Sequence, residues 1–138
     1  MTIEVVRLSD KAKTFLTMLK RKTGIQNWNV LCRWGFCLSL SEPSIPAKEK
    51  FHVDSSIDMN WKVFGGNYAD VYFALLIQRC KQDGFEITSK ILNEQFRLHL
   101  HRGVALLAND PKLANISCLL KLTTNNEWRI INGAANKE

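Results

Sequence analysis

The stretch LKRKTGIQNWNVLCRWGFCLSL, residues 19–40, joins the densest positive charge of the chain to one of its most apolar segments. Lys20, Arg21 and Lys22 stand together near its start, and Arg33 is the only charged residue in the apolar part. This arrangement has two interpretations. The charges are either a solvated helix end or a binding face that is fixed to a rigid core.

The apolar part predicts a helix from Asn27 or Asn29 to about Ser41. Apolar side chains cover nearly all of its faces, and a helix that is apolar all round has to be buried on all sides. In a chain of 138 residues, this points to a central helix or to a surface that self-associates. We expect the following residues in the core or in an oligomer interface: Trp28, Leu31, Trp34 and Phe36.

The residues before this helix predict another one, which ends in the basic triplet. Ser9 is a good N-cap, and the negative charge of Asp10 in the first turn favours the helix dipole. Gly24 is a natural C-cap directly after the triplet. A narrow apolar stripe at helical spacing should face the core: Ala12, Phe15, Leu16 and Leu19.

Positive charge is concentrated in the first third of the chain, whose full length has a formal net charge of +6. Residues 1–41 contain seven basic and two acidic residues, a net charge of +5, whereas residues 42–138 contain twelve and eleven, a net charge of +1. This excess suggests a polyanionic partner, and nucleic acid fits better than an anionic membrane. Solubility alone is the other explanation.

The basic residues of the first helix are the predicted DNA contacts. No array of Asn or Gln accompanies them, so they should bind phosphates rather than read bases. We therefore expect binding to double-stranded DNA that tolerates sequence and weakens with salt. The alternative is a lysine-rich solvated helix whose last turn favours cations through its dipole. The predicted contacts are Lys11, Lys13, Lys20, Arg21 and Lys22.

Strands are predicted in two places. Ile3 to Leu8 is rich in β-branched residues and indicates a short strand. After a connector with two prolines, residues 41–50, Ile57 to Val63 alternates between apolar and polar residues, which is typical of a half-buried strand. Phe51 to Val53 is its candidate partner in a hairpin.

The second half of the chain predicts more helices. One follows Gly65-Gly66, with Asn67 as its cap and Asp70 at the N3 position, and ends before Gly84. A long helix capped by Thr88 runs to about Ala108 and is interrupted by Gly103. Asp110-Pro111 begins a further helix, with Asp as cap and Pro as the first helical residue. Residues 134–138 form a tail.

These elements predict a mainly α fold. We expect one compact helical domain of about five helices, with a short N-terminal strand and a small central β element. Its strand–helix–helix opening is similar to the ribbon–helix–helix arrangement, in which two chains pair their strands. The single domain, residues 1–138, is divided into a basic strand–helix–helix part (1–41), a connector with the β element (42–66), a helical part (67–133) and the tail (134–138).

No catalytic, metal or cofactor site is predicted. His99 and His101 are two residues apart, so they point to opposite sides of a helix and cannot chelate one metal ion. His101 and Arg102 are expected on an exposed or subunit-facing side. The four cysteines, Cys32, Cys37, Cys80 and Cys118, contain no CxxC pair. They are expected to be free and mostly buried, and Cys32 and Cys37 to have a high thiol pKa in apolar surroundings.

The chain shows no signal peptide and no run of about 20 apolar residues. We therefore expect a cytoplasmic protein without a membrane partner.

Several stretches resemble the DndE family of DNA phosphorothioation (DNA sulfur modification) proteins in order and spacing, over about residues 5–110. They are SDKAK at residues 9–13, LKRKTGI at 19–25, WNVLCRWGFCLSLSEPS at 28–44, GGNYADVYFALLIQRCKQDG at 65–84 and LHLHRGVALLAND at 98–110. The resemblance implies a small bacterial subunit of a system, akin to restriction–modification defence, that replaces a non-bridging phosphate oxygen of DNA with sulfur. It implies work beside a cysteine desulfurase, an iron–sulfur protein and an ATPase, which carry the chemistry.

We therefore expect a non-catalytic, oligomeric DNA-binding subunit of this system, a dimer or tetramer that needs no cofactor. Two alternatives stay open. One is a regulator of the ribbon–helix–helix type, and the other is a DNA-nicking or sulfur-handling enzyme that uses Cys32, Cys37 or the region of His99 and His101.

Overall fold

The computed structural model of the chain describes residue 3, residues 5–51 and residues 58–110. Helices dominate this part, which confirms the mainly α fold with a small β element. In chain order the elements are β1 (Val5–Arg7), α1 (Asp10–Thr23), α2 (Trp28–Ser41), β2 (Asp58–Asn60), α3 (Trp61–Gly65), the 3₁₀ turn η1 (Gly66–Tyr68), α4 (Ala69–Gln82) and α5 (Ser89–Asn109).

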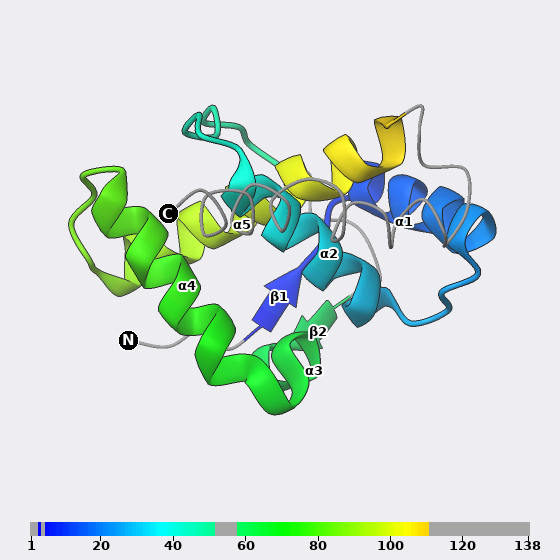
Figure 1. Cartoon of the computed structure of the whole chain (residues 1–138), viewed down its shortest axis with the longest axis horizontal. Coiled ribbons are helices and arrows are strands. Elements are labelled where there is room, and N and C mark those ends of the chain that lie inside the picture. Colours follow the sequence, from blue (N-terminus) through cyan, green and yellow to red (C-terminus); the bar gives the residue numbers. More distant parts are fainter. Residues whose placement is uncertain (1–2, 4, 52–57, 111–138) are drawn as a thin grey trace, which may run out of the picture.

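Helix α5 is the centre of the fold. It packs along α2, and it also contacts α1 and α4, which lie toward opposite ends of the molecule (Figure 1). Because α5 has neighbours on several sides, it is buried on several faces, including its histidines. Gly103 lies inside α5 and does not interrupt it, contrary to the sequence prediction. The small residue serves there as a contact surface for α2.

Most of the predicted helix ends are confirmed. The Ser9 hydroxyl caps α1 by accepting a hydrogen bond from the Ala12 amide at 3.1 Å. Gly24 ends α1 in the left-handed conformation with φ of 76°, which favours glycine. The Thr88 hydroxyl caps α5 and accepts from the Ile91 amide at 3.2 Å.

The start of α4 differs from its prediction. Asn67 lies in η1 and is not a helix cap; α4 begins two residues later, and Tyr68 before it makes no side-chain capping bond. Gly66 has φ of 58°, so the chain turns there and enters α4 through the 3₁₀ turn instead of through a capped start. Asp70 is in the first turn of α4, where its charge favours the helix dipole.

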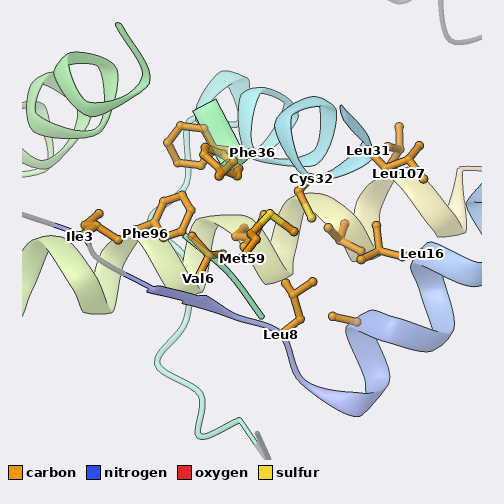
Figure 2. Packing of buried hydrophobic residues seen from close by; sticks show 14 of the residues in the cluster. Ile3, Val6, Leu8, Leu16, Leu31, Cys32, Phe36, Met59, Phe96 and Leu107 are labelled. Carbon is orange, nitrogen blue, oxygen red and sulfur yellow. The ribbon is translucent and has the colours of Figure 1, made fainter. Parts of the chain in front are cut away.

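Strand β1 pairs with β2 in an antiparallel sheet of two strands. Val6 pairs with Met59, and both side chains are buried in the core (Figure 2). Arg7 pairs with Asp58, and their side chains make an exposed ion pair at 4.0 Å. The strand–helix–helix order is therefore present, but β1 pairs with a strand of its own chain instead of with that of a second chain, as a ribbon–helix–helix dimer would require.

The second predicted strand is only partly correct. Its residues from Trp61 onward form α3, because the Asn60 side chain accepts a hydrogen bond from the Val63 amide at 2.7 Å and so caps a helix. Alternation over a few residues does not exclude a helical turn. Phe51, the first residue of the candidate hairpin partner, lies in no strand, and residues 52–53 are outside the described part.

An aromatic cluster joins α2, α3 and α5. The Phe36 and Phe64 rings meet edge to face at 5.8 Å, and Phe96 lies 5.2 Å from Phe36 and 5.1 Å from Phe64. Trp61 stacks on Phe64 at 5.1 Å. Only the helical form of residues 61–65 places Trp61 and Phe64 on this cluster together, and such aromatic pairs stabilise by about 0.5–1.5 kcal/mol beyond their burial.

The prediction that α2 is buried on all sides is wrong for the single chain. Its face toward α5 is buried, including Leu31 and Phe36, but Cys37 is exposed and Trp34 is half-buried. The central position in the fold is taken by α5, which packs against α1, α2 and α4.

The helix predicted from Asp110-Pro111 and the tail at residues 134–138 lie outside the described residues, and the division into one domain of four parts stays a prediction. Within the described part, no helix is both long enough and apolar enough to cross a membrane.

Candidate nucleic-acid interface

Helix α1 presents the predicted basic residues. It buries a stripe made of Ala12, Leu16, Leu19 and Thr23 against the core. Arg21 is exposed on the side that helical geometry places opposite this stripe, and Lys13 is exposed as well. The helix carries five basic residues and one acidic residue, Asp10. Figure 1 shows α1 at one end of the molecule, away from α4.

Lys20 is held in place by an aromatic ring. Its ammonium lies 3.7 Å from the centre of the Trp28 ring, which belongs to the first turn of α2. A cation over the face of an indole ring is attracted by about 0.5–1 kcal/mol at such partly exposed sites. The half-buried Lys20 is thus a positioned charge, and it couples the basic end of α1 to the start of the apolar helix α2.

The other flank of α1 carries Lys11 and Lys22. They are eleven residues apart, which places them on nearly the same side of a helix. Lys11 is exposed, with its ammonium 5.9 Å from the Phe15 ring, and Lys22 is half-buried. The five basic side chains thus surround the outward half of α1 as a broad cationic surface.

The four predicted core or interface residues divide into two pairs. Leu31 and Phe36 are fully buried in the core and are not accessible to a second chain. Trp28 and Trp34 are half-buried and pack against the core with part of their rings outside.

A second cluster of charge lies at the end of α2, and sequence reasoning missed it. Arg79 of α4 is buried and makes an ion pair with Asp83 at 2.8 Å. It also donates to the carbonyls of Leu40 at 2.7 Å, Pro43 at 3.2 Å and Ser44 at 2.8 Å. The spacing of four residues between Arg79 and Asp83 hints at their pairing, but nothing in the sequence indicates that they hold the connector.

Arg102 of α5 holds the same connector from the other side. Its guanidinium donates to the Ser39 carbonyl at 2.8 Å, to the Ser39 hydroxyl at 2.8 Å and to the Ser44 carbonyl at 2.8 Å. Two arginines therefore satisfy carbonyls that the end of α2 would otherwise leave without intrahelical partners. Both arginines are used for structure.

His99 and His101 serve different contacts. His99 Nδ1 lies 2.8 Å from the Ser39 hydroxyl. His101 Nε2 accepts a hydrogen bond from the Ser9 amide at 3.1 Å, so its proton is on Nδ1, which donates to the Arg97 carbonyl at 2.8 Å. The two rings thus contact different segments, Ser39 of α2 and Ser9 before α1.

The prediction that His101 and Arg102 lie on an exposed or subunit-facing side is wrong for His101, whereas Arg102 is half-buried. The His101 ring is buried and stacks on Phe51 at 3.9 Å, because the connector folds back over α5. Burial lowers the pKa of both histidines, that of His99 to about 4. Both are therefore neutral at pH 7.

Cys32 and Cys80 are free and buried. Burial raises the pKa of Cys32 to about 12 and that of Cys80 to about 11, which makes both thiols weak nucleophiles near neutral pH. Cys37 is exposed, and Cys118 lies outside the described residues. Within the described ranges, no group of three or more His, Cys, Asp or Glu residues is arranged to hold a metal ion.

Arg33, the charged residue of the apolar helix, lies at the edge of the core. Its Nε donates to the Asn29 carbonyl at 3.3 Å, and the side chain is half-buried beside Gly66. The stem thus crosses the core edge while the guanidinium stays near the surface.

Known proteins resemble this chain in sequence and in structure. The model of the family "DNA sulphur modification protein DndE" matches residues 5–115. The crystal structure of DndE from Escherichia coli B7A, involved in DNA phosphorothioation modification, superposes with a TM-score of 0.64 at 21% identity and covers 78% of this chain and 98% of that chain. A DndE mutant involved in DNA phosphorothioation superposes with a TM-score of 0.61 at 20% identity and covers 78% of this chain and 99% of that chain. No curated protein matches significantly.

The match to the family model and the shared fold place the chain in the class of DNA sulfur modification proteins. Within this class, it belongs to the DndE family. The family model extends over the basic helix, the connector and the central helix, so the resemblance noted in the sequence over about residues 5–110 is confirmed.

Proposed function

We propose that the protein is a non-catalytic DNA-binding subunit of the phosphorothioation system, which binds the phosphate backbone of double-stranded DNA through α1 and acts in the cytoplasm as a homo-oligomer. The observation that carries this proposal is the cationic surface of α1, where Lys20 is fixed over Trp28 at 3.7 Å. Membership of the DndE family supports the link to phosphorothioation.

The geometry of α1 suits a phosphate backbone. Lys13 and Lys20 are seven residues apart, which corresponds to about 10 Å along the helix axis. Duplex DNA carries one negative charge per ~1.7 Å of its axis, so both ammonium groups reach phosphates of one site. Long lysine stems recognise charge and not base edges, and binding is therefore sequence-tolerant and salt-sensitive.

Self-association would multiply this surface. Each copy offers only a few phosphate contacts, and several copies on one duplex gain affinity through avidity. The described surface offers an apolar strip on the side of α4 and η1, where Tyr68 is 65%, Val71 52% and Leu75 42% exposed. Val71 and Leu75 share one face of α4, and Tyr68 precedes that helix. A second copy that covers this surface would bury it without involving α1.

In this proposal the chemical steps are carried out by the partner subunits, which are a cysteine desulfurase, an iron–sulfur protein and an ATPase. Three of the four residues that the enzyme alternative would use are engaged in the fold: His99 and His101 are buried and hydrogen-bonded, and Cys32 is fully buried with a pKa of about 12. The fourth, Cys37, is exposed.

The DNA-binding proposal is tested by neutralising the triplet. The variant Lys20→Gln/Arg21→Gln/Lys22→Gln and the matched control Lys62→Gln/Lys81→Gln/Lys90→Gln lose the same charge, but the control residues are exposed lysines of α3, α4 and α5. Affinity for a random-sequence duplex is measured by fluorescence anisotropy at several salt concentrations.

We expect the triplet variant to bind at least tenfold more weakly at low salt and to have a shallower salt slope. Each lost phosphate contact lowers the slope of log K against log salt by about 0.9. The control should retain most of its affinity. Equal losses in the two variants would show that net charge alone matters and would reject the α1 interface, whereas strong preference for one sequence would favour the regulator.

The oligomer has its own test. Sedimentation of the full chain at micromolar concentration should give a mass above that of the 15.8 kDa monomer, and Val71→Asp/Leu75→Asp should lower it. A monomeric mass of the unaltered chain would reject self-association, and an unchanged mass of the double variant would reject the α4 surface.

A further inference from the structure

A large groove lies where the first turn of α1 meets the C-terminal half of α5. It has a volume of about 1070 Å³, which is at the upper end for pockets that enclose a ligand. The first turn of α1, the last turn of α2, residues 46–51 of the connector and α5 form its walls. Its apolar lining consists of Phe15, Leu38, Phe51, Leu98, Ala105 and Leu106.

The walls of this groove are firmly built. His101 at its base is fixed by the Ser9 amide and by stacking on Phe51, and Arg102 is fixed by Ser39 and Ser44. The groove is therefore a formed part of the fold. Leu106 is 41% exposed within it, and a concave apolar surface of this size indicates an occupant.

The end of α5 directs the chain to this groove. Asp110 is one of the lining residues, and its backbone is extended, with φ of −72° and ψ of 114°. Pro111 disfavours a helical conformation of the residue before it, so α5 has to end here. Residues 111–138 thus begin at the rim of the groove.

The sequence that follows is complementary to the groove. Apolar residues recur at helical spacing, as expected for the amphipathic helix predicted from Asp110-Pro111. The segment 111–122 contains two lysines and no acidic residue, and the groove is lined by four acidic and three basic side chains. The apolar residues are Leu113, Ile116, Leu119, Leu120 and Leu122.

This segment extends beyond the fold that is shared with other DndE proteins. The family model ends at residue 115, and 98% of the Escherichia coli B7A DndE chain is matched by 78% of this one. The present chain therefore carries additional residues next to a groove that belongs to the shared part.

We propose that residues 111–122 bind in this groove of their own chain, with Leu113, Ile116 and Leu119 or Leu120 against its apolar walls. A helical segment of ten residues is about 15 Å long, and the groove follows α5 from Leu98 to Asp110, about 18 Å along the helix. The bound segment would cover the first turn of α1 and the connector.

Crosslinking of the full chain tests this proposal. In a Cys37→Ser background, Leu106→Cys places a thiol in the groove, and the native Cys118 is the reporter in the segment. The matched control is Val63→Cys, which is exposed on α3 and lies outside the proposed α4 surface. A short bismaleimide is added at low protein concentration, and the products are identified by mass spectrometry.

We expect an intrachain crosslink between positions 106 and 118 in most molecules, and at least tenfold less between positions 63 and 118. Absence of the 106–118 crosslink would overturn the proposal. A crosslink that joins two chains would overturn it as well, because the occupant would then belong to a second copy.

Hydrogen exchange gives an independent measurement. The full-length variant Leu113→Ser/Ile116→Ser/Leu119→Ser should increase amide exchange at least tenfold in residues 46–51 and in the first turn of α1. The control Thr123→Ser/Thr124→Ser/Asn125→Ser should not. Exchange in the core of α2 reports whether the fold persists, and unchanged exchange around the groove in a folded variant would contradict the proposal.

Discussion

Gly35 and Gly103 lie against each other where α2 crosses α5, and a Cβ atom built on Gly103 would overlap the Gly35 carbonyl. A Cβ atom on Gly35 would lie 2.8 Å from the Val104 amide nitrogen, closer than such contacts occur. The missing side chains let the two backbones touch. This approach sets the position of α2 on α5, and with it the aromatic cluster around Phe36.

The variant Gly103→Ala should therefore be less stable. Helix propensity alone predicts a gain of about 1 kcal/mol for alanine inside a helix, whereas forcing atoms into a packed contact typically costs about 1–3 kcal/mol or more. Urea unfolding followed by circular dichroism measures the net change. Ala105→Gly, two residues further along α5, is the control. Its free energy of unfolding should fall by about 1 kcal/mol, which is the difference in helix propensity alone. A Gly103→Ala variant as stable as the unaltered chain would contradict the close crossing.

Arg79 should contribute far more to stability than Arg7, although each makes one ion pair. Arg79→Met leaves the Asp83 carboxylate buried without its partner and removes donors from three carbonyls of the connector. Loss of one member of a buried pair costs about 3–5 kcal/mol. Arg7→Met removes an exposed pair at 4.0 Å, which contributes about 0–1 kcal/mol. Denaturant unfolding of the two variants compares them directly, and similar losses would show that the Arg79 network contributes little.

The sequence predicted the fold class well because its strongest signals are local. Ser9, Gly24 and Thr88 cap their helices through contacts within a few residues, and the structure confirms all three. The error at residues 61–63 has a different origin. Over so few residues, an alternating pattern fits a strand and also a short helix. The helix is favoured because Phe64 then contacts Phe36 and Trp61 contacts Phe96, and these partners are distant in sequence.

The basic helix could be predicted, but its attachment could not. The sequence pattern is enough to place Lys20 on a basic helix. It does not show that α2 packs so that the Trp28 ring lies under the Lys20 ammonium. Gly103 was misread as an interruption of α5 because its partner Gly35 is far away in the chain. The Arg102–Ser39–His99 contacts were missed for the same reason, since they join residues about sixty positions apart.

His99 should make the fold sensitive to acid. Burial, with the nearby charges of Arg79 and Arg102, lowers its pKa to about 4, whereas the pKa in the unfolded chain is ~6.5. Between these pH values the unfolded state binds a proton that the folded state does not. The free energy of unfolding is therefore not reduced by His99 above about pH 6.5, and it falls as the pH decreases toward 4. The decrease is about 2 kcal/mol between pH 7 and pH 5.

The variant His99→Asn tests this because its amide can still reach the Ser39 hydroxyl but does not titrate. Unfolding free energies at pH 7 and pH 5 should differ by about 2 kcal/mol less in the variant than in the unaltered chain. His101, whose pKa is lowered too, remains in both proteins and cancels in the comparison. A variant with the full pH dependence would show that His99 is already charged in the folded state.

Thiol labelling should separate the structural cysteines from the accessible one. Cys32 and Cys80 are buried, and their pKa values of about 12 and 11 leave very little thiolate at pH 8. In a Cys118→Ser background, the native protein should therefore react rapidly with a thiol reagent at one position, the exposed Cys37, and the other two should react only after unfolding. Mass spectrometry of the labelled peptides assigns the sites. Rapid labelling of Cys32 in the folded chain would reopen the sulfur-handling alternative, because a thiol that reacts while the core is intact has a route to solvent and a thiolate to use.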